Sequence, residues 1–260
     1  MPDTALYVYA IVPHSGTTAE FGRIGIDRSE VAAVALPEAG IAAIVHAGPP
    51  TPYQGPDAEV QRRVLEHSRV VEHAWETFGT VLPVTFNVIV KSELDAPADK
   101  RLRSWLQESA ATMRGRLDAL RGRVELRVEI SLESEVAGRD TPESREILNQ
   151  IAEKPAGLRR LLERKLEQLH KDHAAQVADR LYPDIRRRIA AITQDLVENR
   201  RHHAQPGHVS VFSAAVLTTR DSIEPLGAEL ARIQTEIPAA HIRFLGPWPP
   251  YSFTDTPPAP

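Results

Sequence analysis

The chain has 260 residues, of which 42% are apolar and 25% are charged, and it carries a formal net charge of −4 and no cysteine. This is the composition of a globular protein that can bury a core, and the length favours two domains over one. A chain without cysteine forms neither a disulfide nor a thiolate metal site, and the slight negative charge disfavours binding to nucleic acid or to anionic lipid. The sequence shows no signal peptide and no apolar stretch long enough to span a bilayer, so we expect a cytoplasmic protein without membrane insertion.

Strand and helix patterns alternate in the N-terminal third of the chain. Residues 6–12 are apolar, aromatic or β-branched on both alternating sets, which predicts a central strand covered on both faces. Residues 31–36 and 41–46 flank a turn-rich spacer and predict a hairpin. Between Asp57 and Gly79, apolar residues recur at steps of three and four, which predicts a helix with one buried face. That face comprises Val60, Val64, His67, Val71, Trp75 and Phe78.

The rest of the chain alternates between strand and helix patterns and includes one long helical stretch. Residues 141–201 form this stretch, which we expect to break at Lys154–Gly157 and again at Pro183. Residues 124–130 alternate strictly between apolar and polar side chains, as in a half-exposed strand. The remaining segments predict strands at 80–90, 208–217 and 241–245 and helices at 97–120 and 221–236.

From Thr80 onward, the predicted order is strand, helix, strand, helical stretch, strand, helix, strand. This is the ferredoxin-like βαββαβ pattern, with the helical stretch inserted between its second and third strands. We therefore predict an α+β protein of two domains: an N-terminal α+β domain at residues 1–80 and a modified ferredoxin-like domain at residues 81–260. The helical insertion occupies about 142–203, and a proline-rich tail follows at 254–260.

No motif of a catalytic or phosphate-binding site occurs in the chain. It has no G-x-S-x-G nucleophile elbow, no Walker A sequence and no G-x-G-x-x-G fingerprint. Several histidines are candidates for a metal site, but their neighbours are charged residues without fixed ligand spacing, so a solvated surface explains them better. These histidines are His170, His173, His202, His203 and His208. We expect no catalytic residue, no metal and no cofactor.

The segment Gly246–Phe253 differs most from the rest of the sequence. Its residues are Gly246, Pro247, Trp248, Pro249, Pro250, Tyr251, Ser252 and Phe253. Three prolines hold three large aromatic side chains in a backbone expected to lie close to polyproline II, an arrangement that suits tight packing. The segment therefore either fills a groove between domains of its own chain or presents anchors to a partner.

Four blocks of the sequence occur together in a known family. They are the strand at 6–12 with Tyr9, the stretch from His67 through Leu82, Pro83 and Phe86, the strand at 124–130 and, above all, Gly246–Phe253. With these blocks the chain resembles the gas vesicle protein F/L family (GvpF/GvpL) over nearly its whole length. After Leu82-Pro-Val that family usually has Arg-Phe-Gly, where this chain has Thr85-Phe86-Asn87. A role tied to that arginine or glycine does not transfer.

The resemblance implies two α+β domains, the second a modified ferredoxin-like one. It also implies an accessory component of gas vesicle assembly that binds the hydrophobic major shell protein and limits its aggregation during nucleation. Other gas vesicle accessory proteins are further partners, and no enzymatic activity is expected. Two alternatives stay open: a hydrolase that binds a metal through the histidines, and an interaction scaffold outside gas vesicles whose helical stretch forms a homodimer.

Overall fold

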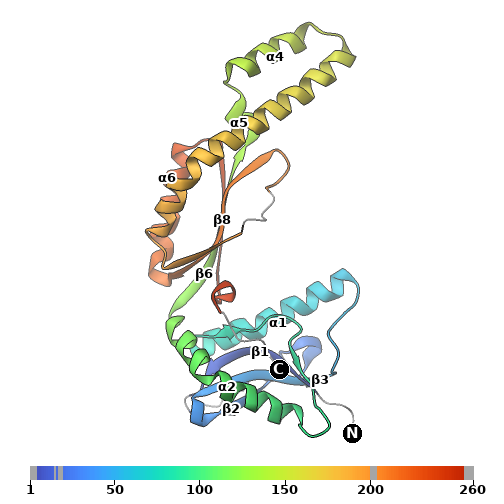
Figure 1. Cartoon of the computed structure of the whole chain (residues 1–260), viewed down its shortest axis with the longest axis vertical. Helices are drawn as coiled ribbons and strands as arrows, with labels where there is room; N and C mark the ends of the chain where they lie inside the picture. Colours follow the sequence, from blue (N-terminus) through green and yellow to red (C-terminus); the bar gives the residue numbers. More distant parts are fainter. Residues whose placement is uncertain (1–4, 15, 17–19, 200–203, 255–260) are drawn as a thin grey trace. The chain divides into compact units, whose positions relative to one another are not determined.

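The computed structural model describes residues 5–14, 16, 20–199 and 204–254, which fall into two compact units (Figure 1). The first unit comprises Met1–Val124 and Trp248–Pro260, and the second comprises Glu125–Pro247. The chain therefore passes between the units twice. The domain boundary predicted at residue 80 lies inside the first unit, because the strand at Leu82–Pro83 pairs with the first strand of the chain.

The first unit is built on a sheet whose central strand is β1 (Ala5–Pro13). The strand order is β2–β3–β1–β4, and β5 also pairs with β1. These strands are β2 (Ala32–Leu36), β3 (Ile41–Gly48), β4 (Leu82–Pro83) and β5 (Ile89–Val90), and all their pairings are antiparallel. The predicted central strand and hairpin are confirmed. The strand predicted at 80–90 is instead two short strands, because the backbone turns between them at Asn87, whose φ is +73°.

Two helices cover the two faces of this sheet (Figure 1). α1 (Asp57–Phe78) buries His67 and Trp75 as the spacing predicts, whereas Val64 of the same predicted stripe is 37% exposed. α2 (Ala98–Ala119) packs against β1, β2 and β3 from the other side. Because both faces are covered, β1 is apolar or aromatic along its length. Short 3₁₀ helices lie at Ile26–Arg28 (η1) and Pro37–Ala39 (η2).

The second unit is a four-stranded sheet in the order β7–β8–β6–β9. The strands are β6 (Arg123–Glu133), β7 (Asp195–Glu198), β8 (His208–Thr219) and β9 (Ala240–Trp248). The helices are α3 (Ser134–Gly138), α4 (Pro142–Glu153), α5 (Ala156–Ala190), η3 (Arg220–Ser222) and α6 (Ile223–Glu236). α5 and α6 lie on the same face of the sheet (Figure 1). No helix among the described residues is long and apolar enough to cross a membrane.

The polar side of β6 is less exposed than its alternating sequence predicts. Glu125 and Glu129 are each only 7% exposed, and Arg243 of β9 donates a hydrogen bond to Glu129 at 3.0 Å. The prediction of a half-exposed strand is therefore wrong. β6 is an inner strand, so side chains of the neighbouring strands cover its polar face as well as its apolar one.

The order of elements in the second unit differs from the predicted one. Residues 82–90 and α2 belong to the first unit, so the second unit begins at β6 and continues with α3, α4, α5, β7, β8, α6 and β9. The helical stretch thus connects β6 to β7, a strand that the prediction had included in the helix. Strand β7 ends at Glu198, and residues 200–203 of the predicted stretch lie outside the described part of the chain.

Only one of the two predicted breaks in the helical stretch occurs. The chain leaves α4 at Lys154 and enters α5 after Pro155, but α5 continues through Pro183. Pro183 and Asp179 are both exposed, so solvent reaches the Asp179 carbonyl group that the proline leaves without its helical partner. The lost hydrogen bond therefore does not end the helix.

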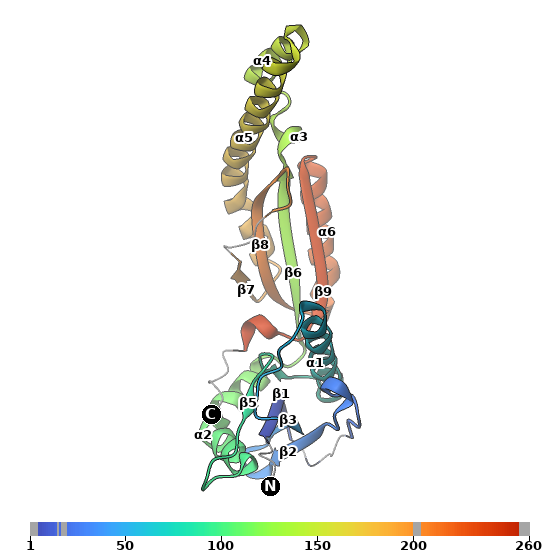
Figure 2. The same cartoon turned by 90° about the vertical axis from the view of Figure 1, so that its right-hand side faces the viewer.

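α5 is tied to α6 by an ion-pair network on the helical face of the sheet. Arg188 of α5 pairs with Glu229 and Glu236 of α6, the latter at 2.6 Å. The hydrogen bond from Arg188 lowers the pKa of Glu229 despite the opposing effect of burial. Arg232 also pairs with Glu229. These contacts fix the C-terminal half of α5 on the sheet, and its N-terminal half extends beyond the strands of the unit (Figure 2).

Candidate partner-binding surface

The predicted C-terminal motif continues β9 and then turns. Gly246 has φ of +118°, the peptide bond to Pro247 is cis, and ψ of Pro250 is 65°. A 3₁₀ turn, η4 (Tyr251–Phe253), ends the motif, and the Tyr251 amide donates to the Pro249 carbonyl at 2.8 Å. The expected polyproline II backbone is therefore interrupted, because the chain closes a hydrogen-bonded turn within the motif.

Two of the prolines and one of the aromatic residues of the motif are covered by their own chain. Trp248 and the residues after it belong to the first unit by their contacts. Pro249, Pro250 and Phe253 are buried, and Phe253 is only 6% exposed. Of the three aromatic side chains, Tyr251 alone is more than a third exposed. The motif offers a partner little aromatic surface.

A buried cluster of tyrosines and histidines joins β1, β3 and α1. The Tyr7 hydroxyl lies 2.9 Å from Nδ1 of His67, and the Tyr9 hydroxyl lies 2.8 Å from Nδ1 of His46. These four side chains are at most 2% exposed. Nε2 of His46 lies 3.1 Å from the hydroxyl of the part-buried Tyr53. Solvent and partners do not reach the inner part of this cluster.

Backbone groups determine where the protons of the cluster lie. Nε2 of His67 lies 3.0 Å from the carbonyl oxygen of Val84, which can only accept, so the Nε2–H donates and Nδ1 accepts from Tyr7. The Tyr7 hydroxyl in turn accepts from the Asn87 amide. The Tyr9 hydroxyl accepts from a backbone amide in the same way and donates to His46.

The inner members of the cluster are uncharged. Burial lowers the pKa of His46 to about 4, and it lowers the pKa of His67 to about 4 against the opposing effect of the hydrogen bond to Val84. Burial also raises the pKa of both Tyr7 and Tyr9 well above the usual value. Neutral groups with complete hydrogen bonding suit a structural core. They form no pair of a nucleophile and a base.

The residues that matched the family in sequence gather around this cluster. Tyr9 and His67 are members of it, and the Phe86 ring centroid lies 5.9 Å from that of His67. Leu82 and Pro83 are buried in β4, which pairs with β1. Their surroundings are those of a core that holds strands and helix together.

Asn87 explains how the chain tolerates its departure from the family pattern. Its φ of +73° lies in the left-handed region, where glycine fits most easily and asparagine is tolerated. The Asn87 side chain accepts from the Tyr53 amide at 2.8 Å and donates to the Tyr53 carbonyl at 3.1 Å. Asparagine therefore keeps the turn that glycine would make and adds two hydrogen bonds to the loop that contains Tyr53.

Two of the histidines considered for a metal site, His170 and His208, line one cleft together with several glutamates, but they are not placed to share a metal ion. His170 and His173 lie on α5, and His208 begins β8, where its ring centroid is 5.7 Å from that of His241. His202 and His203 lie outside the described residues. Within the described part of the chain, no group of three or more histidine, aspartate or glutamate side chains is placed to hold a metal ion.

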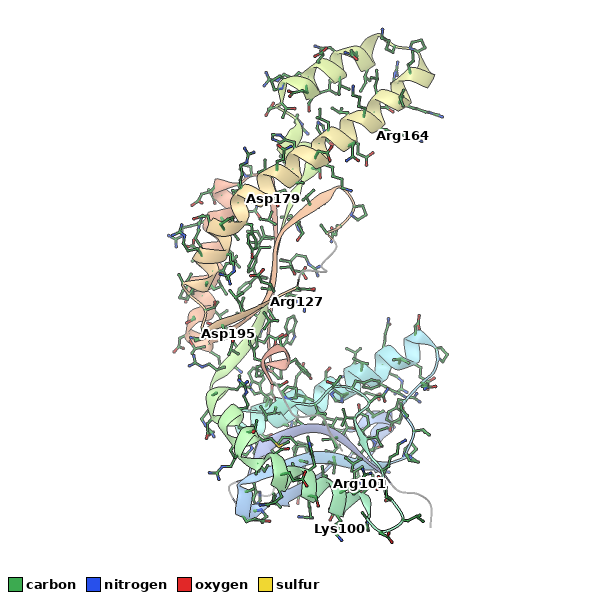
Figure 3. All side chains as sticks on the ribbon, in the orientation of Figure 1. Lys100, Arg101, Arg127, Arg164, Asp179 and Asp195 are labelled. Carbon is green, nitrogen blue, oxygen red and sulfur yellow. The ribbon has the colours of Figure 1, made fainter. Side chains whose placement is uncertain are left out.

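The α4–α5 hairpin carries the most exposed leucines of the described part of the second unit. Leu148 of α4 is 43% exposed, and Leu158 and Leu161 of α5 are 52% and 63% exposed. Ile147, next to Leu148, is 7% exposed, so the hairpin has an apolar seam of its own besides this outer surface. Figure 3 shows Arg164 on the part of α5 that extends past the strands and Asp179 on the part that covers them. The hairpin is thus a projecting element with exposed apolar side chains.

A cleft of about 730 Å³ lies at the base of this hairpin. It is bounded by the end of β6, by α3, by Leu148 of α4, by α5 and by the loop that precedes β8. Its apolar lining includes Leu148 and Leu166, and its charged lining includes Glu163 and Glu167. Leu148 is both an exposed leucine and a lining residue of the cleft, so the candidate surface of the second unit includes the cleft as well as the hairpin.

Comparison with known proteins identifies the family. The model of the family "Gas vesicle synthesis protein GvpL/GvpF" matches residues 5–255. The chain belongs to the GvpL/GvpF family. It is 29% identical to gas vesicle protein L1 of Halobacterium salinarum over 95% of this chain and 89% of that protein. It is 25% identical to gas vesicle protein L of Haloferax mediterranei over 75% of this chain and 62% of that protein.

Solved GvpF structures share the fold. The crystal structure of GvpF from Anabaena sp. PCC7120 matches with a TM-score of 0.68 at 18% identity, over 98% of this chain and 97% of that one. GvpF from Microcystis aeruginosa matches with a TM-score of 0.63 at 17% identity, over 96% and 99% of the two chains. The protein therefore has the mixed helix and sheet fold of GvpF. Its membership of the GvpL/GvpF family gives it a role in gas vesicle formation.

For this GvpL/GvpF member, the sequence favours the helical stretch as the contact surface, but the residues of the cleft are not apparent from it. The leucines at 158, 162, 166 and 169 predict one helical stripe that covers other elements, yet Leu158 is 52% exposed. Glu163, Glu167 and His170 follow each other at helical spacing on α5, a signal of a shared face. Glu133, Gly207 and His208 complete the cleft from distant parts of the chain, and only the fold brings them there.

Proposed function

We propose that the protein is an accessory binding protein of gas vesicle assembly that performs no bond-making chemistry. It engages the hydrophobic major shell protein, together with other gas vesicle accessory proteins, and limits aggregation of the shell protein during nucleation. Its place is the cytoplasm and the growing gas vesicle. Family membership supports the gas vesicle role, and the exposed leucines of the α4–α5 hairpin are the observation that carries the binding role.

The physical basis is coverage of apolar surface. Exposed apolar side chains that cluster on one element mark interaction sites, because their burial against a partner removes apolar area from water. Leu148, Leu158 and Leu161 lie on a two-helix element that extends from the sheet, so a partner can reach them. A helical apolar surface of this kind suits an amphipathic or hydrophobic segment of the shell protein.

Replacing the three leucines tests the proposal. We expect the variant Leu148→Ser/Leu158→Ser/Leu161→Ser to retain at least tenfold less shell protein in co-purification than the wild type. Each leucine that is no longer buried against the partner costs roughly 1–2 kcal/mol of binding free energy. Leu65→Ser is the matched control, because Leu65 is 60% exposed on α1 in the other unit. Circular dichroism checks that both variants fold. If the triple variant retains as much shell protein as Leu65→Ser, the hairpin is not the contact surface.

Two further features belong to this proposal. The second unit is a modified ferredoxin-like domain, which is supported by its order strand, helices, strand, strand, helix, strand and its sheet order β7–β8–β6–β9. The motif Gly246–Phe253 anchors the chain on the first unit after β9 rather than binding a partner. The burial of Phe253 and the return of the chain from β9 to the first unit support this role.

A further inference from the structure

We infer that the cleft at the base of the α4–α5 hairpin receives a lysine or arginine side chain carried on an apolar-faced helix of the partner. This inference deepens the proposed function and rests on it. It assigns the cleft selectivity for a charge, whereas the leucines supply apolar contact alone.

The charges of the cleft are unbalanced. Glu133, Glu135, Glu163 and Glu167 line it, and Arg139 is the cationic side chain among its lining residues. Arg139 pairs with Glu135 at 2.9 Å. Within the described residues, Glu133, Glu163 and Glu167 have no cationic partner. Three carboxylates that converge on one cleft attract a cation and disfavour an anion.

His170 provides the second, independent observation. It lines the cleft and is only 6% exposed, and its Nε2 has no hydrogen-bond partner among the described groups. The close approach of α3 contributes to this burial, since a Cβ on Gly138 would lie 2.7 Å from Cδ2 of His170. Burial lowers the pKa of His170, which favours the neutral ring. A neutral imidazole nitrogen can accept a hydrogen bond, and a buried polar atom without a partner in the fold calls for one, from a water molecule or from a ligand.

The shape and lining of the cleft suit a long cationic side chain. Leu148 and Leu166 are apolar lining residues, and lysine and arginine pack an aliphatic stem against apolar surface while the charged end reaches polar groups. Leu148 also belongs to the exposed leucine surface. A helix whose apolar face lies on Leu148 therefore places a neighbouring cationic residue at the cleft. Charge complementarity selects this occupant over an acidic or purely apolar one.

Two labelled peptides test the inference in the full-length protein. Both are amphipathic helices with the same leucine face, and one has lysines and the other glutamines on the polar face. Fluorescence anisotropy gives the Kd of each at low and high salt. We expect the lysine peptide to bind about fivefold more tightly at low salt, since a few exposed ion pairs contribute roughly 1 kcal/mol together, and to lose this preference at high salt.

Charge variants on α5 locate the effect. Glu163→Gln/Glu167→Gln is expected to abolish the preference for the lysine peptide and to leave the Kd of the glutamine peptide unchanged. Asp179→Asn removes a negative charge from the same helix outside the cleft, so it should keep the preference (Figure 3). The variant Leu148→Ser/Leu158→Ser/Leu161→Ser should weaken the binding of both peptides equally. Suppose that the leucine variant weakens the binding of both peptides while Glu163→Gln/Glu167→Gln still binds the lysine peptide more tightly than the glutamine peptide. The inference is then overturned and the proposed function stands. If the leucine variant changes the Kd of neither peptide, the proposed function itself fails.

Discussion

Acidification from above pH 6.5 to pH 4 is expected to destabilise the first unit by roughly 6 kcal/mol, about 3 kcal/mol for each of its two buried histidines. His46 and His67 have a pKa of about 4 in the folded protein, against an ordinary value of 6.5. Between these values the unfolded chain binds protons that the folded one excludes. The free energy of unfolding therefore falls as the pH drops through this window and levels off below pH 4.

The geometry explains why protonation is so unfavourable. A proton on Nδ1 of His67 would face the Tyr7 hydroxyl, which already accepts from the Asn87 amide and would then have no acceptor for its own hydrogen. The same conflict arises between His46 and Tyr9. A buried charge without a partner is costly. Acid therefore acts on the contacts that join β1, β3 and α1.

Urea unfolding followed by tryptophan fluorescence measures this effect. All three tryptophans belong to the first unit, so the signal reports on that unit. The variant His67→Gln is the control, because an amide can accept from Tyr7 and donate to Val84 without titrating. It should lose about half of the pH dependence between 6.5 and 4. A wild-type midpoint that stays constant across this window would show that the histidines titrate normally.

Gly246→Ala is expected to destabilise the second unit by about 3 kcal/mol. Gly246 has φ of +118°, which side chains rarely adopt. A Cβ there would lie 2.9 Å from the Glu125 carbonyl oxygen and 2.9 Å from Cδ2 of Leu126, both on the inner strand β6. The carbonyl is part of the sheet backbone and cannot move aside cheaply, so β9 must shift away from β6.

Gly227→Ala is the matched control for this substitution. Gly227 lies in α6 of the same unit, and a Cβ there would meet only the Phe244 ring at 3.8 Å, an ordinary contact. In a helix, alanine is more favourable than glycine by about 0.5–1 kcal/mol, so this variant should be as stable as the wild type or slightly more so. Hydrogen exchange of the β6 and β8 amides measures both variants. Equal protection in Gly246→Ala and the wild type would contradict the steric argument.

The local elements of the first unit could be read from the sequence, whereas the assignment of strands to sheets could not. The apolar pattern at 6–12 and the spacing of His67 and Trp75 follow from burial alone, and both are confirmed. Residues 82–90 read as the start of a second sheet, yet they pair with β1. Pairing between strands far apart in sequence leaves no local signal in so short a segment.

Helix length and surface exposure depended on tertiary context in the same way. Pro183 predicts a break, but its exposed position in α5 leaves the freed carbonyl to solvent, and the helix continues. The leucines of α5 at 158, 162, 166 and 169 predict one covered stripe, but the N-terminal half of α5 extends past the sheet, and Leu158 is 52% exposed. The motif at Gly246–Phe253 was recognisable as unusual, and its contacts with the first unit became visible only in the fold.

The most direct test of the central claim is light scattering by the shell protein as it is diluted out of denaturant. With equimolar wild-type protein or Leu65→Ser present, we expect the scattering to remain low, because the hairpin covers apolar surface that would otherwise associate. With Leu148→Ser/Leu158→Ser/Leu161→Ser present, the scattering should rise as it does without any added protein. Equal suppression by the triple variant, or none by the wild type, would contradict the account.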